Sequence, residues 1–421
     1  MKRTLVCLGV CATTLLMASS LRAEQPKSPH ILALPTLTIS GQTSFNTWFY
    51  HNERTILQED SRAWERVGYG GGPLFTMDDT RLRFTVDGKT DLGLRYGFIA
   101  VLDGDTSAQK TLRENYIFLE GTWGKLYAGD TYGILSTMAF GGWDNWCGTK
   151  FLDGSPERVV NFTTGTVHSL SLVGDTSRDT KLTYMTPRWK GVQLGVSYTP
   201  RSQHRGEQDV NSVTAYDGGK VPFDVNNIAG GVNFIHKFLN DFEMALSATY
   251  VFGQTKPPYQ GSFPNQGPDP LKNISSFAIG SSFSYKDIGF SMEYGNNGKS
   301  QQLTGQSLSN AGQFLDFGLS YTWGPTKFGA GYYYSWRKAL GGGLTSEFTA
   351  VNATTNGVAA AVDHKMAPGM IVYFEYANYL MKNAAAADET ARVNYNITSD
   401  NAGVTPNNRA NAFIVGSRLV F

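Results

Sequence analysis

Strict alternation between apolar residues and small or polar residues is the feature that most limits what this chain can fold into. In 326–337, 241–253 and 312–323, apolar or aromatic residues occupy every second position, and small or polar residues occupy the positions between them. Successive side chains of a β-strand point to opposite faces, so each segment is predicted to be a strand whose two faces meet different surroundings. Helical periodicity is nearly absent, and an all-β fold follows.

Sixteen segments fit this pattern, and the connections between them alternate between short and long without a break. The short connections, such as 239–240 and 324–325, have good turn chemistry, whereas the long ones, such as 51–79 and 131–177, are rich in Gly, Asn, Asp, Ser and Pro. The predicted strands are 37–50, 80–87, 92–102, 111–120, 124–130, 178–187, 191–199, 227–238, 241–253, 274–285, 288–295, 312–323, 326–337, 353–364, 369–381 and 410–421.

A soluble β-sandwich also alternates, but it has no reason to place short turns at one end and long loops at the other. That asymmetry is typical of a transmembrane antiparallel β-barrel of the bacterial outer membrane. Aromatic residues near strand ends, such as Phe242 with Tyr250 and Phe252, suit the aromatic girdles at the two membrane interfaces. Gly, Ser, Thr and Asn on the opposite face indicate a wetted inner wall, because a barrel of this strand number is too wide for side chains to fill.

The composition agrees with this fold class and excludes others. The 421 residues include 47 glycines, aromatic residues reach 13% and charged residues only 17%. The mean hydropathy of −0.26 argues against a bundle of membrane helices, each of which needs roughly 20 apolar residues in succession. With 36 Lys and Arg against 35 Asp and Glu, the chain has no basic excess for nucleic acid.

Residues 1–23 are predicted to be a cleaved signal peptide, which leaves residues 24–421 as the barrel domain. Lys2 and Arg3 precede an apolar stretch from Leu5 to Leu16, and Ala23 ends a cleavage-like sequence. The alternative is an uncleaved anchor, for which the apolar run is short. Cleavage would leave Cys147 as the one cysteine, and we expect it to be a buried small residue without a disulfide.

The C-terminus points the same way. Phe413, Val415, Leu419 and Phe421 share one face of the last predicted strand, and the chain stops at Phe421. A terminal aromatic residue on an alternating strand resembles the signal that the outer-membrane assembly machinery reads. Phe421 is therefore the predicted assembly signal.

The sequence resembles the trimeric general porins of Gram-negative outer membranes. The resemblance rests on three segments: Arg113 to Gly129, which looks like the family's fourth strand, turn and fifth strand; Lys181 to Pro187 followed by Trp189 to Gln193; and the terminal Phe421. Asp130 stands where the family usually has a basic residue. The resemblance implies a sixteen-stranded homotrimer in contact with outer-membrane lipid and lipopolysaccharide, through which small hydrophilic solutes and ions diffuse passively.

In the resembled family the third loop folds inward and narrows the channel, and here 131–177 is the longest connection. Acidic loop residues facing arginines on the inward face of the wall would create a transverse field that selects among solutes. The predicted constriction residues are Arg81, Arg83, Arg95 and Arg113 on the wall and Asp144, Asp153 and Glu157 in the loop.

Enzymatic chemistry has little support in the sequence. No Gly-x-Ser-x-Gly elbow or His-Glu-x-x-His helix occurs, and the six histidines are far apart. We therefore expect no enzymatic activity, no metal site and no cofactor. Two alternatives to a passive diffusion channel stay open: a substrate-selective channel for sugars, phosphate or other anions, and a barrel hydrolase of the outer membrane.

Overall fold

The computed structural model divides the chain into two units, Met1–Leu34 and Pro35–Phe421, and the strands of the described residues lie in the second unit. The predicted signal peptide, 1–23, lies outside the described residues. The structure describes 34–53, 57–60, 63–66, 71–104, 112–154, 159–160, 172–202, 204–206, 223–256, 271–302, 310–341, 349–383 and 407–421.

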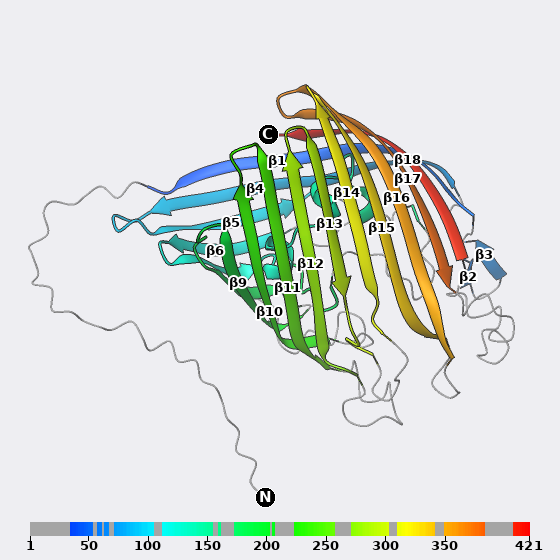
Figure 1. The fold of residues 1–421 in the computed structure, drawn as a ribbon, viewed down its shortest axis with the longest axis horizontal. Helices are drawn as coiled ribbons and strands as arrows, with labels where there is room; N and C mark the ends of the chain where they lie inside the picture. Colours follow the sequence, from blue (N-terminus) through cyan, green and yellow to red (C-terminus); the bar gives the residue numbers. More distant parts are fainter. Residues whose placement is uncertain are drawn as a thin grey trace, which may run out of the picture. The chain divides into compact units, whose positions relative to one another are not determined.

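Sixteen antiparallel strands close into a barrel, as the alternation predicts. Each strand pairs with its neighbours in the sequence, and β1 closes the barrel by pairing with both β18 and β4. Strands β10 to β17 form the near wall in Figure 1, and β1 and β4 to β6 cross behind them. The strands are β1 (Thr36–Asn52), β4 (Gly71–Lys89), β5 (Arg95–Asp103), β6 (Leu112–Gly121), β7 (Gly124–Asp130), β8 (Thr180–Met185), β9 (Val192–Arg201), β10 (Phe223–Lys237), β11 (Phe242–Lys256), β12 (Ile274–Tyr285), β13 (Ile288–Asn296), β14 (Gln313–Trp323), β15 (Thr326–Gly341), β16 (Thr349–Ala367), β17 (Met370–Asn383) and β18 (Asn407–Val420).

The predicted connection 51–79 is wrong in extent, because β4 begins nine residues earlier than the sequence indicates. Gly71 pairs with His51, and Gly72, at φ +147°, pairs with Tyr50. Asp79, at φ 49°, marks a bulge between two registers of the β1 to β4 pairing. A bulge reverses the alternation of side chains along a strand, so this stretch looked irregular in the sequence. A separate two-stranded sheet, β2 (Leu57–Asp60) and β3 (Ala63–Arg66), precedes β4.

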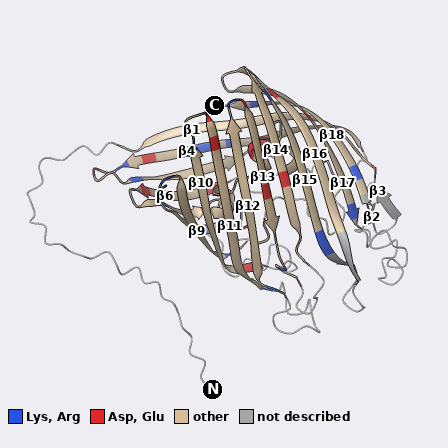
Figure 2. Cartoon of the chain, viewed as in Figure 1, with Lys and Arg blue, Asp and Glu red and all other residues tan. Residues whose placement is uncertain are grey.

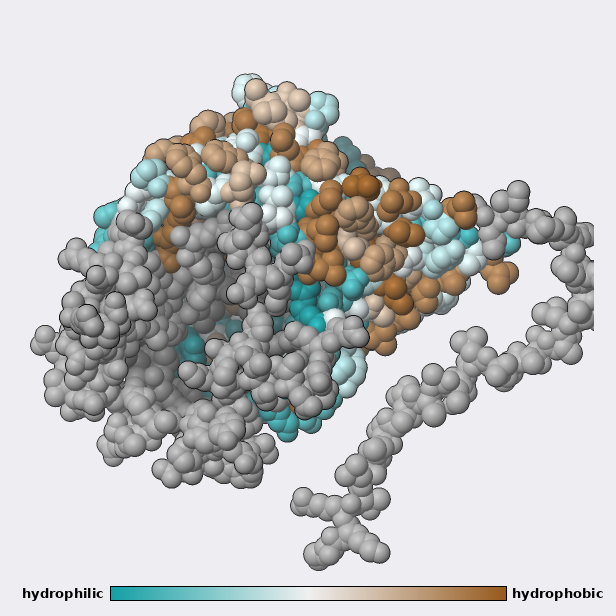
Figure 3. Space-filling model, turned by 180° about the vertical axis from the view of Figure 1, so that it is seen from behind, coloured by the Kyte–Doolittle hydropathy of each residue, from teal (hydrophilic) through white to brown (hydrophobic). Residues whose placement is uncertain are grey.

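The outward face of the barrel is apolar. Large exposed side chains recur at every second position, as in Leu246, Tyr250 and Phe252 of β11, and charged residues are sparse along the strands (Figure 2). Hydrophobic residues gather in patches on the surface seen in Figure 3. Trp123, Trp189 and Trp323 are exposed at the end that carries the short turns, where an interfacial girdle is expected. None of the helices within the described part of the chain is long and apolar enough to cross a membrane.

Two adjacent strands are much shorter than the rest. β7 has seven residues and β8 has six, whereas the other barrel strands have between nine and 19. A strand tilted by about 45° needs roughly 9–11 residues to cross the hydrocarbon core of a bilayer. We call the outward face of β7 and β8 the low wall.

Much of the inner face is packed rather than wetted, which overturns the expectation from composition. Ser291, Asp316, Ser335 and Thr355, all on the inward face, have no exposed surface. They are covered because the connection between β7 and β8 adds apolar side chains to a buried cluster with residues of the wall, among them Trp48, Trp146, Phe151, Leu152, Phe314, Tyr333 and Tyr379.

Candidate functional site

The described residues of the connection between β7 and β8 include three short helices that lie against the inward-facing residues of the barrel. These are α1 (Ile134–Thr137), η1 (Gly142–Asp144) and α2 (Phe151–Gly154). The helices contact β9 to β11 and β13 to β16 in turn. Backbone N–H groups of the connection donate to side chains of the wall, from Ile134 to Ser197 Oγ (2.9 Å) and from Phe140 to Ser247 Oγ (2.9 Å).

Glycines on the wall let the connection come this close. An added Cβ at Gly280 would lie 1.7 Å from the carbonyl oxygen of Phe140, and one at Gly318 would lie 2.1 Å from that of Gly142. The same crowding occurs at Gly195, Gly231, Gly329 and Gly331. We call these six residues, spread over β9, β10, β12, β14 and β15, the glycine track. The glycines that suggested a wetted lumen are thus the surface on which the connection packs.

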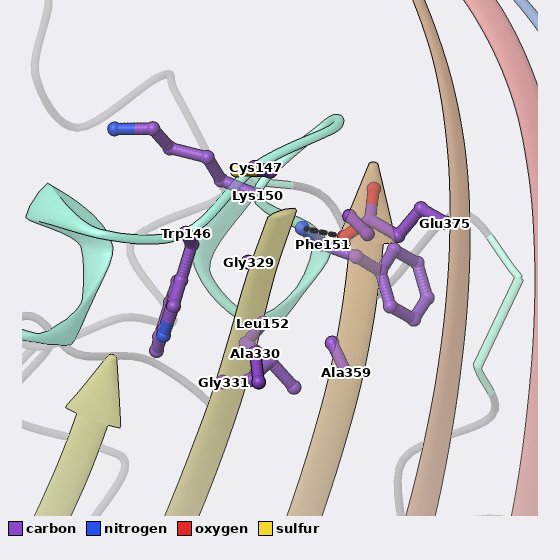
Figure 4. A pocket seen from close by; sticks show the side chains of 11 residues that line it. Trp146, Cys147, Lys150, Phe151, Leu152, Gly329, Ala330, Gly331, Ala359 and Glu375 are labelled. Carbon is purple, nitrogen blue, oxygen red and sulfur yellow. Dashed lines mark hydrogen bonds between the residues drawn. The ribbon is translucent and has the colours of Figure 1, made fainter. Parts of the chain in front are cut away.

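Buried carboxylates of the wall hold the middle of the connection. Glu375 Oε2 accepts hydrogen bonds from the N–H (2.7 Å) and the hydroxyl (2.6 Å) of Thr149, while Oε1 accepts from the N–H of Phe151 (3.0 Å). Asp363 accepts from the N–H of Gly148 (2.6 Å). Figure 4 shows Glu375 facing Phe151 across a narrow gap lined by small residues of β15 and β16. Charge-assisted bonds of this kind are roughly twice as strong as neutral ones.

A buried lysine ties the two ends of the connection together. Lys181 Nζ, on β8, donates to the carbonyl oxygens of Thr131 (2.7 Å) and Ser177 (2.6 Å), with a longer contact to Thr176 (3.4 Å). Lys181 is only 4% exposed, so these carbonyls replace the water that an ammonium group requires. The connection is therefore held at both ends by Lys181 and in its middle by Glu375 and Asp363.

The inward face of β4 to β6 carries all four predicted wall arginines. Arg81 pairs with Asp79, and Arg83 Nη2 lies 3.5 Å from the hydroxyl of Tyr116. Among the described residues, only the beginning of the connection contacts β6. The Thr131 hydroxyl, for example, donates a hydrogen bond to Glu114 of β6 (3.3 Å). Ile134 of α1 shares a buried cluster with Met185 of β8, but in the part of the chain that the structure describes α1, η1 and α2 pack mainly against β9 to β16 and not against the inward face of β4 to β6. We call this side the open half of the barrel.

Arg95 and Arg113 lie at opposite ends of the open half. Arg95 is at the short-turn end, where it pairs with both Asp87 and Glu120 (2.8 Å to the latter). Arg113 is at the long-connection end, where it pairs with Asp103 (2.9 Å) and donates to the Tyr132 hydroxyl (3.3 Å). The four predicted arginines thus share one wall but not one depth in the channel.

The acidic residues of the predicted constriction are placed only in part. Asp144, in η1, accepts a hydrogen bond from the N–H of Gly141 (3.1 Å) and is exposed. Asp153 belongs to α2, but its side chain lies outside the description, as does the whole of Glu157. Cys147 is buried, as predicted, and burial raises the pKa of its thiol to about 12.

A cavity of about 400 Å³ lies between the two ends of the connection and the inward face of β11 to β13. The wall contributes Thr249, Ala278 and Glu293, and the connection contributes Tyr132, Leu135, Ser136, Ala139, Trp143, Leu172, Asp175 and Ser177. Sequence reasoning missed this cavity, because its residues are separated by more than a hundred positions and no local pattern joins them. We call it the luminal chamber.

A closed antiparallel barrel with an apolar outer face, and with charged side chains on its inner face, defines the class of transmembrane channel proteins built from β-strands. A family model described as Gram-negative porin matches residues 11–384. The chain belongs to the Gram-negative porin family, and it is an outer-membrane channel.

Similar sequences and structures cover nearly the whole chain. Uncharacterised proteins of Rickettsia typhi and Rickettsia conorii are 23% and 24% identical, and each match covers 89% of this chain and 93% of the relative. In fold, the chain is similar to a loop-deletion mutant of OmpT, an outer membrane protein of Vibrio cholerae (TM-score 0.54, 14% identity, 92% of this chain and 100% of that one). It is also similar to OmpT in a trimer form and to the outer membrane channel DcaP of Acinetobacter baumannii (TM-scores 0.53 and 0.52, identities 12% and 10%, each covering 92% of this chain and 100% and 98% of the other chain).

Proposed function

We propose that the protein is a porin for passive diffusion of small hydrophilic solutes and ions across the outer membrane. The observation that carries the proposal is the open half, where charged side chains line the inner face and the helices of the connection leave that face uncovered. Charged groups beside an aqueous path favour hydrated solutes and oppose lipophilic ones. A closed sheet satisfies its own backbone hydrogen bonds, so the wall itself can cross lipid.

A planar-bilayer recording of the purified protein tests this proposal. We expect stepwise, ohmic conductance in potassium chloride, with uncharged solutes passing up to a size limit and without saturation. Folded protein that inserts and conducts nothing would contradict the proposal.

The connection between β7 and β8 is proposed to set the narrowest point, with Arg81, Arg83 and Arg113 on one side. The proposed acidic side comprises Asp144, Asp153 and Glu157, and Arg95 would act nearer the short-turn end. Replacing Arg81, Arg83 and Arg113 together by glutamine should shift the reversal potential towards cations. Arg188→Gln, in the turn after β8, is the matched control, and an unchanged potential in the triple variant would remove these arginines from the constriction.

A homotrimer is also proposed, with the low wall facing a neighbouring copy. Between Trp123 and Asp130, β7 offers Leu126 and Ala128 to the outside, whereas β11 offers six apolar residues in alternation. Such a short apolar band cannot match a hydrocarbon layer about 25 Å thick, and a second protein wall removes the mismatch. Unheated samples in mild detergent gels should migrate as a trimer and heated samples as a monomer.

Residues 1–23 are proposed to direct export and to be cleaved as a signal peptide, and Phe421 is the proposed assembly signal. The Phe421 N–H and carbonyl pair with Gly41 on β1 (3.0 and 2.8 Å), so the last residue joins the seam that closes the barrel. The intact mass of the purified protein should correspond to a chain that starts at Glu24. Removal of Phe421 should lower the amount of assembled barrel in the outer membrane.

A further inference from the structure

The luminal chamber combines three kinds of lining at one place. Leu135 and Trp143 supply apolar surface, Ser136, Ser177 and Thr249 supply hydroxyl groups, and Asp175 and Glu293 supply carboxylates. Its volume, about 400 Å³, lies within the range of small-molecule sites, which are mostly apolar with a few placed polar groups. One side of the chamber is the inward face of β11 to β13, so the chamber lies inside the barrel.

Asp175 brings a carboxyl group to this chamber. Its carboxylate accepts hydrogen bonds from the Ser177 N–H (2.8 Å) and the Ser136 hydroxyl (3.4 Å). Among the described residues it forms no ion pair. Asp175 lies outside the strands, and burial raises the pKa of its carboxyl group.

Arg178 brings the opposite charge to the rim of the same chamber. Its guanidinium lies over the ring of Tyr132 (5.4 Å to the centroid) and donates to the Tyr132 hydroxyl (3.1 Å). Tyr132 and Ser177, its ring partner and its neighbour in the chain, both line the chamber. In the described part of the chain Arg178 has no carboxylate partner, whereas Arg113 pairs with Asp103 and Arg205 with Asp130.

Asp175 in the lining and Arg178 beside it, both without an ion-pair partner among the described residues, bring opposite charges to one edge of a partly apolar chamber and match a molecule that carries both charges. We propose that the luminal chamber binds zwitterionic α-amino acids with apolar side chains during their passage. The amino acid's carboxylate pairs with Arg178, its ammonium group with Asp175, and its side chain packs on Leu135 and Trp143. This inference rests on the proposed channel function and names a preferred class of solute.

Equilibrium binding of radiolabelled leucine to the detergent-solubilised, folded protein tests the site without relying on conductance. Competition with leucinamide, which lacks the carboxylate, and with N-acetylleucine, which lacks the ammonium group, tests the two ends separately. We expect saturable binding, with each analogue competing at least about tenfold more weakly than leucine.

Two variants should each remove one of these two preferences for leucine over its analogues. Arg178→Gln should weaken leucine binding about tenfold and remove the preference for leucine over leucinamide, because the carboxylate partner is gone. Asp175→Asn should instead remove the preference over N-acetylleucine. Arg188→Gln, in the turn after β8, is the control and should bind leucine as the wild type does.

The outcomes separate this inference from the proposed channel function. Conducting protein that does not bind leucine, or that binds all three compounds equally, overturns the inference and leaves the channel intact. Equal losses of leucine binding in Arg178→Gln and Arg188→Gln also overturn it. Saturable leucine binding by protein that conducts nothing in planar bilayers supports the site and contradicts passive diffusion.

Discussion

The two sides of the barrel differ in strand length and in the side chains that line them. The wall from β12 to β17 is built from strands of nine to 19 residues. Its inner face combines Gly, Ala and Ser with buried acids and with large buried side chains such as Phe314, Tyr333 and Tyr379. The low wall of β7 and β8 has strands of seven and six residues. Next to it, the open half keeps arginines on its inner face.

The difference follows from what each side touches. A wall that faces lipid on its outside needs strands long enough to cross the bilayer. Where protein packs on its inside, small inward residues let the two backbones approach closely. A wall beside water keeps charged side chains, which hydration and neighbouring charges stabilise. Within one closed sheet, the composition of the inner face therefore indicates which strands a covering segment occupies.

The largest expected effect compares charges placed on the two outer faces. Ala248→Arg puts a cation on the outward face of β11, among residues that meet the middle of the bilayer. It should lower the free energy of unfolding by about 2–4 kcal/mol, measured by urea titration in lipid vesicles. Ala128→Arg, on the low wall, should cost the monomer little and should remove the trimer from unheated gels. Equal destabilisation of the two monomers would show that the low wall also faces deep lipid.

An intermediate effect is expected where the glycine track is filled. Gly318→Val would force a side chain against the Gly142 carbonyl and should cost about 1–3 kcal/mol through overpacking. It should also change single-channel conductance, because the connection must move. Gly230→Val is the matched control, since an added Cβ there meets nothing within 4 Å. Unchanged conductance in Gly318→Val would separate the glycine track from the channel path.

The smallest expected effect concerns the acids that hold the connection. Glu375→Gln keeps one acceptor oxygen but loses the charge. It should weaken the hydrogen bonding that holds Thr149 and Phe151 against the wall by about 1 kcal/mol. Faster amide hydrogen exchange at 148–151 is the measurement. Glu120→Gln, in the open half, removes a carboxylate that pairs with Arg95 and should leave exchange at 148–151 unchanged. Equal acceleration in both variants would mean that the two sides are not held independently.

Much of the fold could be predicted from the sequence, because period-two alternation and turn chemistry are local. All sixteen barrel strands were found, and β7 was predicted with its observed bounds. The largest error concerns β4, where Gly72 at positive φ and the bulge at Asp79 interrupt the alternation. Such irregularities are imposed by the pairing partner rather than by the segment's own residues.

The candidate site could be predicted less well. Inward parity identifies Arg81, Arg83 and Asp316 alike, but it does not tell which of them meets water and which meets protein. That distinction depends on where the connection lies, which is decided by residues far along the chain. Asp175 and Arg178 carried no local signal, because their significance comes from the chamber and from the partners they lack among the described residues.

The anchoring of the connection also dictates an order of events during assembly. Asp363 and Glu375 follow the backbone groups that they hold by 215 and 226 residues. Contacts of such long sequence separation form late, since much of the chain must first be brought together. Until β16 and β17 have joined the sheet, the backbone from Gly148 to Phe151 lacks the carboxylates of Asp363 and Glu375 that bind it. The constriction that we propose for this connection would therefore form only after β16 and β17 have joined the sheet.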